Sequence, residues 1–276
     1  MSTPDAGLTT ADGAARAHSR GMLERHEDPD GFLGYRSPLL ASLGIPHVFT
    51  TRRLAHGREL DLVHPDPAVR ARVGRAAGLE SAPLVAVKQV HGAHVLLLRA
   101  GELPPPVAEA DGLVSERPDA LVGVHTADCV PVLLARRDGR RVAAVHAGWR
   151  GVVAGVVPRA LEMLGDGPLA AAIGPCLSRR HFEVGPEVTA AFTHVGLAAS
   201  ILPGAPGTRD HIDLVTAVEL QLHAGGVRLI DASGVCTYAD EAEFYSYRRD
   251  VTHGGRGRTG RLGAWIAAHP ERRARD

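Results

Sequence analysis

The sequence predicts an α/β fold, a single domain in which helices flank a central mixed β-sheet. Short apolar runs follow one another closely between residues 84 and 173, which favours a mixed or antiparallel sheet over a doubly wound parallel one. Segments with helical capping signals lie before and after this series. Hydrophobic residues make up 45% of the 276 positions and aromatic residues only 4%, so we expect a core of Val, Leu and Ala.

The predicted strands are short runs of aliphatic residues bounded by Gly, Pro or Asp. They cover residues 45–51, 84–87, 95–98, 121–124, 130–135, 142–145, 169–173 and 227–230, with residues 261–268 as a last strand or short helix.

Two predicted helices carry clear capping signals. Asp66 precedes a helix over residues 67–78, and Asp213 precedes one over residues 214–224. A third helix is predicted over residues 152–164, although it contains a glycine and a proline. The remaining predictions are a helix that begins over residues 186–192 and a surface loop over residues 200–209.

The two ends of the chain differ in composition from its middle. Residues 1–31 are mostly small, polar or charged and show no hydrophobic period, so they are predicted to be a flexible N-terminal extension. Residues 32–270 are predicted to form the single catalytic domain, and residues 271–276 a basic, solvated tail.

Charge and cysteine content argue against several classes of function. Thirty-one basic and 31 acidic residues cancel, so no net charge attracts nucleic acid or an acidic membrane. No apolar run approaches the roughly 18 residues of a membrane span, and the first twenty residues lack a secretion signal, so we expect a cytoplasmic enzyme. Cys129, Cys176 and Cys236 are predicted to be reduced thiols or ligands rather than a disulfide framework.

Three candidate metal ligands lie at or beside the ends of predicted strands. His91 stands in KQVHG, Cys129 in TADC and His146 in VHAGW. One thiolate and two imidazoles make a plausible zinc site with one coordination position open. Taken singly, each histidine is more often a surface or core residue, so spacing alone leaves that alternative open.

Several sequence blocks occur in one order between residues 37 and 268. They read KQVHG, ADGLVS, TADCVPVLLA, VHAGWRG, AAIGPC with HFEVGPEV, and FYSYRRD with TGRLG. They resemble the signature blocks of the laccase-domain family, the bacterial purine nucleoside phosphorylases once called polyphenol oxidases. That family includes the peptidoglycan editing factor and is related to the mammalian protein FAMIN. The resemblance implies a cytotoxic necrotizing factor-like α/β fold and usually a monomer.

The resemblance also implies a metal centre and a reaction. It assigns His91, Cys129 and His146 as ligands of zinc, or of copper in some preparations. The implied reactions are phosphorolysis of adenosine, inosine and methylthioadenosine, together with adenosine deamination. The partners would then be a small nucleoside and phosphate, with no nucleic acid and no membrane.

Both reactions need further residues besides the metal ligands. Deamination needs a proton carrier, and Asp128 beside Cys129 is the nearest carboxylate in the sequence. The alternative, of equal weight, is that Asp128 caps the turn or orients a ligand histidine. Phosphorolysis needs cationic groups to hold the phosphate, since arginine binds phosphate bidentately. The candidates in the signature blocks are Arg52, Arg150, Arg248 and Arg249.

Two positions depart from the family pattern. Asp61 stands where relatives usually carry Asn, and His125 is an additional candidate ligand or base.

Three alternative functions stay open at this stage. A cell-wall editing hydrolase would remove misincorporated amino acids from a peptidoglycan precursor with Cys129 as thiolate nucleophile. A copper-dependent phenol oxidase needs several copper sites, usually built on His-x-His pairs, and the chain has none. A non-enzymatic metal-binding or scaffold protein would need no substrate pocket.

Overall fold

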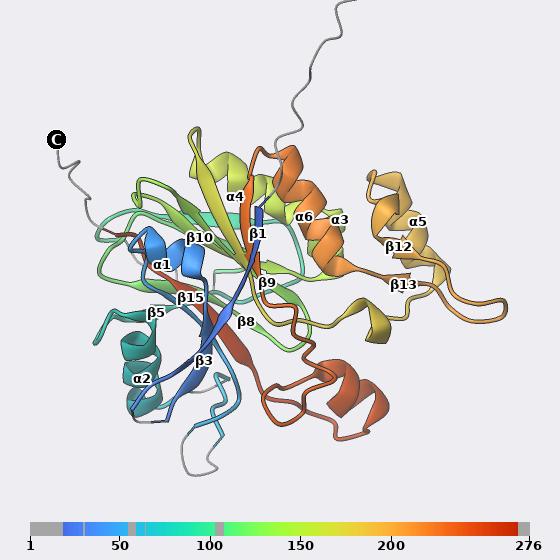
Figure 1. Ribbon diagram of the computed structural model, residues 1–276, viewed down its shortest axis with the longest axis horizontal. Coiled ribbons are helices and arrows are strands. Elements are labelled where there is room, and N and C mark those ends of the chain that lie inside the picture. Colours follow the sequence, from blue (N-terminus) through green and yellow to red (C-terminus); the bar gives the residue numbers. More distant parts are fainter. Residues whose placement is uncertain (1–18, 30, 55–58, 64, 103–107, 270–276) are drawn as a thin grey trace, which may run out of the picture.

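The structure is a computed structural model that describes residues 19–29, 31–54, 59–63, 65–102 and 108–269. The predicted basic tail and the first eighteen residues of the predicted extension lie outside these ranges. The α/β class, with mixed sheets flanked by helices in one domain, is confirmed (Figure 1). In the described part of the chain, no helix is long and apolar enough to cross a membrane.

The strands divide between two mixed sheets. The seven-stranded sheet has the order β1-β14-β11-β9-β10-β7-β6, and the six-stranded sheet the order β2-β3-β4-β15-β8-β5. The first contains Ser19–Met22, Leu229–Ala232, Leu169–Ile173, Val130–Arg136, Val142–Ala147, Gly112–Ser115 and Val95–Leu98 in that order. The second contains Glu24–Glu27, Leu33–Arg36, His47–Thr50, Leu262–Ile266, Leu121–Thr126 and Leu84–Val85. A separate pair, β12 (Ile201–Leu202) and β13 (His211–Ile212), completes the strands.

Helices cover the outer faces of both sheets, so the molecule has four layers. The helices α4 (Val156–Leu164) and α6 (Leu214–Ala224) pack on the seven-stranded sheet, and α2 (Pro67–Ala77) packs on the six-stranded sheet at the opposite side (Figure 1). The remaining helical segments are α1 (Pro38–Ser42), α3 (Trp149–Val153), α5 (Pro186–His194), the 3₁₀ turns Arg179–His181 and Ala198–Ser200, and the π-helix Arg248–His253.

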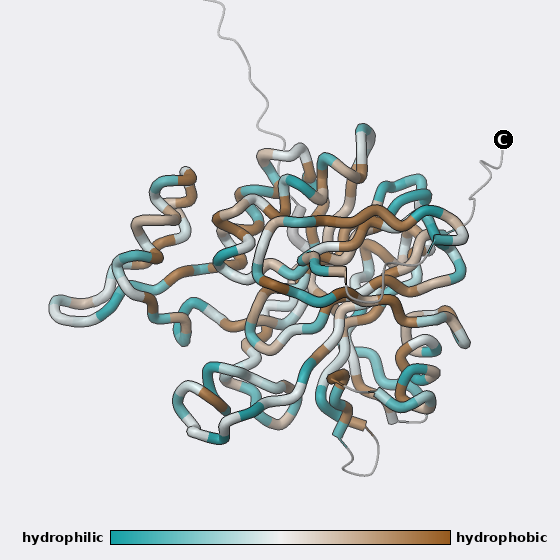
Figure 2. Tube along the Cα trace, turned by 180° about the vertical axis from the view of Figure 1, so that it is seen from behind, coloured by the Kyte–Doolittle hydropathy of each residue, from teal (hydrophilic) through white to brown (hydrophobic). Residues whose placement is uncertain are grey.

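The core between the two sheets is made of small and aliphatic side chains, as the composition predicts. In β10, Val142 and Ala144 face the six-stranded sheet, whereas Ala143 and Val145 face the helices. Both faces of this strand are therefore buried, and its whole run is apolar. The central strands accordingly appear hydrophobic along their length in Figure 2, while many outer turns are hydrophilic.

Described structure begins earlier than the predicted boundary at residue 32. The strand β1 pairs in parallel with β14, and β2 pairs with β3 in an antiparallel ladder. Their sequences, SRGM and ERHE, have no apolar alternation. These strands lie within the segment predicted to be a flexible extension, because backbone hydrogen bonds to a sheet edge can hold a polar segment that has no hydrophobic signal.

The predicted helices are confirmed where capping residues mark them. Asp66 accepts the Val69 N–H at 2.8 Å, and Asp213 accepts the Thr216 N–H at 3.1 Å. The helix predicted over residues 152–164 is divided into α3 and α4, because Gly155 has a φ of +84° and starts a new helix. The loop predicted over residues 200–209 is partly wrong, because its first residues include the short strand β12.

Candidate metal centre

The three predicted ligands lie together at one end of the sheets. His91 lies on the loop between β5 and β6, Cys129 on the turn between β8 and β9, and His146 near the end of β10. One ligand atom from each lies within 4.8 Å of those from the other two. The Cys129 Sγ is 3.9 Å from His91 Nε2, and the two imidazole rings stand nearly perpendicular with centroids 4.8 Å apart. The three residues from separate sequence blocks therefore lie together and could hold one metal ion.

The three side chains differ in exposure, which leaves one side of the cluster accessible. His146 is buried at 3% exposure, Cys129 is half-buried and His91 is exposed. This arrangement is typical of a catalytic metal site, in which protein ligands occupy the inner positions and an outer position admits water or substrate.

Asp111, which the sequence did not single out, connects two of the ligands. Its fully buried carboxylate lies 2.8 Å from His146 Nδ1 and accepts the backbone N–H groups of His91 and Gly92 at 2.9 and 2.6 Å. Because Nδ1 donates to Asp111, Nε2 is the His146 nitrogen that would give up its proton and bind a metal. Asp111 stands in the ADGLVS block, but nothing in that pattern distinguishes it from a turn residue.

The backbone comes unusually close to the ligands at Gly148. A Cβ at this position would lie 3.0 Å from His91 Cδ2 and 3.1 Å from Cys129 Sγ, so a side chain would press on the cluster. His91 and Asp128 have φ values of +60° and +93°, a region that favours glycine. Such backbone conformations persist only where surrounding contacts fix them, and they concentrate at functional sites.

The thiol of Cys129 and the imidazole of His146 stabilise each other as an ion pair. Burial alone would raise the pKa of Cys129, but His146, with a smaller contribution from His91, lowers it to about 6. Burial alone would lower the pKa of His146, but Cys129 and Asp111 raise it to about 9. Cys129 is therefore a thiolate at neutral pH, the form that binds metals and attacks electrophiles.

Asp128 is buried and holds two parts of the chain in place. Its carboxylate accepts the Thr237 hydroxyl at 2.7 Å and the Arg248 backbone N–H at 2.6 Å. Both partners are distant in the sequence, so the carboxylate links the turn before Cys129 to two other segments. These contacts also place the start of the π-helix next to Cys129, which follows Asp128 directly.

Arg150 is the predicted phosphate ligand that lies nearest to the metal ligands in the chain. It follows Trp149 at the start of α3, and its guanidinium carbon lies 4.4 Å from the centroid of the Trp149 ring. The Arg150 side chain is exposed, and among the described residues only this ring contact is recorded for it. Its hydrogen-bond donors are directed to no described carboxylate or carbonyl.

Arg248 and Arg52 make contacts with backbone carbonyls and aromatic rings. The Arg248 guanidinium donates to the Glu183 carbonyl at 3.2 Å and lies over Phe182, with its backbone fixed to Asp128. Arg52 forms an ion pair with Glu59, donates to the Glu241 carbonyl at 3.1 Å and lies over the Tyr245 ring. Arg248 is therefore tied to the residue beside Cys129, whereas Arg52 is neutralised by a carboxylate.

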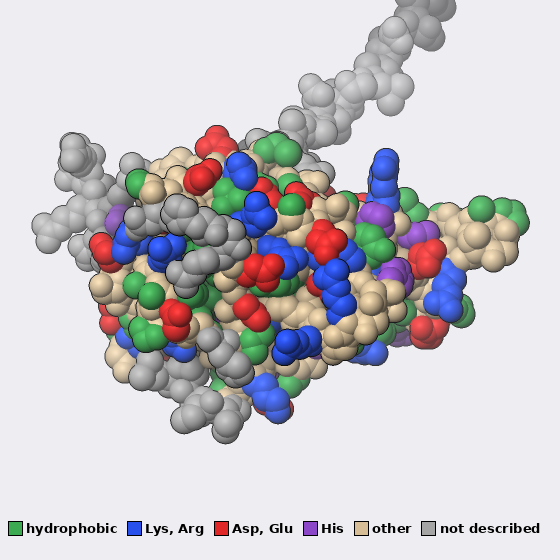
Figure 3. Space-filling model, turned by 90° about the horizontal axis from the view of Figure 1, so that it is seen from below, with side chains coloured by type: hydrophobic (Ala, Val, Ile, Leu, Met, Phe, Trp, Pro, Cys, Tyr) green, Lys and Arg blue, Asp and Glu red, His purple; other side chains and the backbone are tan. Residues whose placement is uncertain are grey.

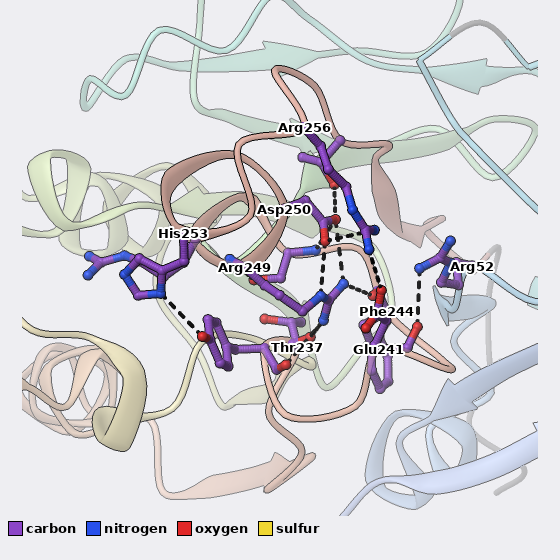
Figure 4. Close-up of polar contacts among 12 residues, drawn as sticks. Arg52, Thr237, Glu241, Phe244, Arg249, Asp250, His253 and Arg256 are labelled. Atoms are coloured by element: carbon purple, nitrogen blue, oxygen red, sulfur yellow. Dashed lines mark hydrogen bonds and ion pairs between the residues drawn. The ribbon is translucent and has the colours of Figure 1, made fainter.

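Arg249 has all of its nitrogen donors engaged within the protein. It donates to Asp250 at 2.9 Å, to the carbonyls of Thr237 and Tyr238 at 2.9 and 3.1 Å, and to that of Phe244 at 2.8 Å. Figure 4 shows it between Thr237 and Phe244, with Arg52 on the far side of Phe244. Arg52 and Arg249 thus approach the same segment and donate to its backbone carbonyls.

His125, the additional candidate ligand or base, lies outside the cluster of three ligands. Its ring packs edge-on against Trp265, and its Nε2 is buried without a hydrogen-bond partner among the described residues. Burial, with Arg261 nearby, lowers its pKa to about 4, so the imidazole is neutral. Asp61 accepts the N–H groups of Val63 and Arg261.

Comparison with known proteins identifies relatives of this chain. The E. coli purine nucleoside phosphorylase YfiH is 36% identical over 251 residues, covering 90% of this chain and 98% of the relative. A purine nucleoside phosphorylase of Deinococcus radiodurans is 37% identical over 246 residues, covering 83% and 92%. A purine nucleoside phosphorylase of Mycobacterium tuberculosis is 41% identical over 205 residues, covering 70% and 80%.

Solved structures and a family model agree with these relatives. The crystal structure of YlmD from Geobacillus stearothermophilus superimposes with a TM-score of 0.75 at 27% identity, covering 89% of this chain and 98% of YlmD. A Neisseria meningitidis protein of the family DUF152 gives 0.67 at 28% identity, covering 90% and 99%. The model described as multi-copper polyphenol oxidoreductase laccase matches residues 67–269. This chain therefore belongs to the multi-copper polyphenol oxidoreductase laccase family.

Proposed function

We propose that this protein is a metal-dependent purine nucleoside phosphorylase that acts on adenosine, inosine and methylthioadenosine and also deaminates adenosine. The observation that carries the proposal is the convergence of His91, Cys129 and His146 on one accessible point, close in the chain to Arg150. Relatives at 36–41% identity that bear the name purine nucleoside phosphorylase support the reaction class. The proposed partners are a free nucleoside and phosphate, bound by a monomer.

The donor set fits a soft or borderline divalent metal. A thiolate and two imidazoles suit zinc, and they also suit copper, which generally binds such sites more tightly than zinc does. Asp111 accepts the Nδ1–H of His146, which directs Nε2 to the metal once the metal displaces the Nε2 proton. When bound here, zinc would supply a Lewis acid and lower the pKa of a coordinated water to ~7. We propose zinc as the physiological metal.

The chain's own residues have separate tasks in the proposed reactions. Asp111 and the close backbone at Gly148 keep the ligands in place before substrate arrives. In phosphorolysis, Arg150 would hold and align the phosphate that attacks C1′ of the ribose, since a guanidinium matches phosphate geometry with two parallel hydrogen bonds. Arg248 is the second candidate for this task because Asp128 fixes it beside Cys129.

The distribution of surface charge supports small-molecule partners over nucleic acid. Basic and acidic side chains are interspersed on the face in Figure 3. Lys88 and several exposed arginines are neutralised by neighbouring carboxylates, as in the pairs Lys88–Glu109 and Arg159–Glu162. A nucleic-acid interface would instead need a continuous basic surface.

Incubation of metal-quantified protein with adenosine, with and without phosphate, tests the proposal. We expect release of adenine only when phosphate is present, with ribose phosphate as the second product, and slower formation of inosine in both samples. Chromatography separates the products. Base release at the same rate without phosphate would mean hydrolysis, and no base release at all would refute the phosphorylase.

Arg150→Ala is expected to reduce phosphorolysis much more than deamination. Phosphate takes no part in deamination, so loss of a phosphate contact affects only one of the two reactions. A hydrogen bond to a charged group contributes roughly 1.5–3 kcal/mol, or about ten- to a hundredfold in rate if it is fully felt in the transition state. Equal losses of both activities, with metal content intact, would remove Arg150 from the phosphate site.

An editing hydrolase that acts on a peptidoglycan precursor is the second candidate. The observation that favours it is the thiolate of Cys129, with its pKa lowered to about 6 beside His146, because a nucleophilic cysteine needs the same pairing. A metal-bound thiolate and a free nucleophile are exclusive roles for Cys129. Stoichiometric metal in active protein therefore supports the phosphorylase, and full activity after metal removal supports the hydrolase.

A phenol oxidase with several copper ions is disfavoured despite the family's name. Among the described residues, one group of three metal-binding side chains is found. The chain has no His-x-His pair of the kind that usually builds multi-copper sites. Phenol oxidation by copper-loaded protein would then arise at the same three ligands.

A further inference from the structure

Two cysteines that are sixty positions apart in the sequence lie opposite each other in the fold. Cys176 follows β11 and Cys236 follows β14, and the two residues form an isolated parallel β-bridge. The Cys176 N–H donates to the Val235 carbonyl at 3.4 Å, and the Thr237 N–H donates to the Cys176 carbonyl at 3.0 Å. Both hydrogen bonds of the bridge thus flank Cys236 and fix it directly across from Cys176.

This backbone geometry suits a disulfide although both thiols are free in the structure. Neighbouring strands lie roughly 4.8 Å apart, within the roughly 4.4–6.8 Å between Cα atoms that disulfides span. The Cys236 Sγ also points back towards the opposite segment, because it lies 3.4 Å from the Ser178 N–H and accepts it. The β-bridge therefore already places the two residues in register with each other.

We propose that Cys176 and Cys236 are a redox modification site that forms a disulfide when the protein meets a peroxide. Cys236 is half-buried and reacts first: its sulfur bonds to one peroxide oxygen, the O–O bond breaks and hydroxide leaves. The Cys176 sulfur then bonds to Cys236 sulfur, the new S–O bond breaks and water leaves with the Cys176 proton. The two thiols supply two electrons, and the peroxide becomes water.

The order of these two steps follows from the surroundings of each thiol. Cys176 is 3% exposed, and burial, with Cys236 next to it, raises the pKa of its thiol. It therefore stays protonated and inaccessible to peroxide until Cys236 has been oxidised. Its fixed position opposite Cys236 then favours closure of the disulfide over further oxidation of Cys236.

The disulfide would fasten a segment that supports the candidate metal centre. Thr237 follows Cys236 directly and donates its hydroxyl to Asp128, the residue before Cys129. The disulfide would join the segments after β11 and β14 and so reduce the conformational entropy of the unfolded chain. The inference concerns the two cysteines alone and does not depend on the proposed phosphorylase reaction.

Hydrogen peroxide treatment of the full, metal-loaded chain tests this site. We expect loss of two titratable thiols, a non-reducing peptide map that links the Cys176 and Cys236 peptides, and a Tm higher by roughly 5–10 °C. A thiol reductant should reverse all three changes. Cys236→Ser and Cys176→Ala should each remove the cross-link and the gain in Tm, whereas Cys129→Ala should retain both.

Three results would overturn the proposal. Peroxide could leave both thiols titratable, it could convert Cys236 to a sulfinic acid without a cross-link, or it could join Cys129 to Cys176 instead. If Cys176→Ala folds poorly because it empties a buried position, Cys236→Ser decides the question, since serine can still accept the Ser178 N–H.

Discussion

Cys129→Ala is expected to abolish stoichiometric metal binding and both proposed activities while the fold is retained. The substitution removes the thiolate, the donor with the strongest preference for a soft metal, and leaves two imidazoles that cannot close the site. We expect a loss of metal affinity larger than the roughly hundredfold cost of disturbing a residue that only supports a ligand. Metal analysis after dialysis, with circular dichroism for the fold, measures the two effects separately.

Cys236→Ser is the matched control for this variant, because it also removes a half-buried thiol but touches none of the three ligands. It should keep both metal and activity. Retention of stoichiometric metal by Cys129→Ala would show that the ligand assignment is wrong. Loss of metal with full retention of activity would instead exclude both a metal-dependent reaction and a Cys129 nucleophile, and would leave another group to explain catalysis.

The retention of fold in Cys129→Ala follows from the position of the site. The three ligands lie on loops and at a strand end, whereas the core is built from aliphatic residues between and outside the two sheets. The truncation removes one sulfur atom from a half-buried position rather than a large core side chain. Its expected cost in stability is therefore within the roughly 0.5–3 kcal/mol of an ordinary destabilising substitution.

Much of this fold was predictable because its central strands are apolar on both faces. Apolar runs such as VPVLLA and VAAV are typical of a buried strand. Asp66 and Asp213 each mark the start of a helix, because their side chains accept a backbone N–H three residues later. The division of the strands between two sheets was not predictable, because it depends on which strands pair across long distances. The polar strands β1 and β2 were also missed, since their order comes from pairing and not from their own side chains.

The candidate site was predictable to the extent that single residues define it. The residue types of His91, Cys129 and His146 are enough to mark them as candidate metal ligands, and each sequence block could be identified without the others. The state of an arginine is different, because it depends on partners far away in the sequence. Arg249 and Arg150 are both arginines in signature blocks. Yet Arg249 donates to four groups of the protein, whereas the Arg150 side chain contacts only the Trp149 ring among the described residues.

Asp111 is the residue through which the fold holds the metal centre together. Asp111 accepts hydrogen bonds both from His146 on β10 and from the backbone of the His91 loop, so the positions of two ligands depend on one carboxylate. Burial would raise the pKa of Asp111, but His146 and the backbone N–H groups of Gly92 and His91 lower it below its ordinary value. The Asp111 carboxylate is therefore ionised and can only accept hydrogen bonds, which suits a position surrounded by N–H donors.

Asp111→Asn is expected to lower metal affinity by about ten- to a hundredfold, the usual cost of removing a group that orients a metal ligand. The amide keeps nearly the shape of the carboxylate but has one oxygen where Asp111 uses two. If its NH₂ faces His146, it donates to Nδ1, the proton moves to Nε2, and that nitrogen can no longer bind the metal. If its oxygen faces His146, it still accepts the His91 N–H, but the Gly92 N–H meets an NH₂ group and loses its acceptor.

Competition with a chelator of known affinity measures this loss, and Asp128→Asn is the matched control. Asp128 is also a buried hydrogen-bond acceptor and lies next to Cys129, but its carboxylate binds Thr237 and the Arg248 N–H rather than a ligand histidine. Both variants should lose stability, by roughly 1–3 kcal/mol for a buried group left without its partner, whereas only Asp111→Asn should lose metal. Equal metal affinity in the two variants would mean that His146 and the His91 loop hold their positions without Asp111, and that the carboxylate serves the fold alone.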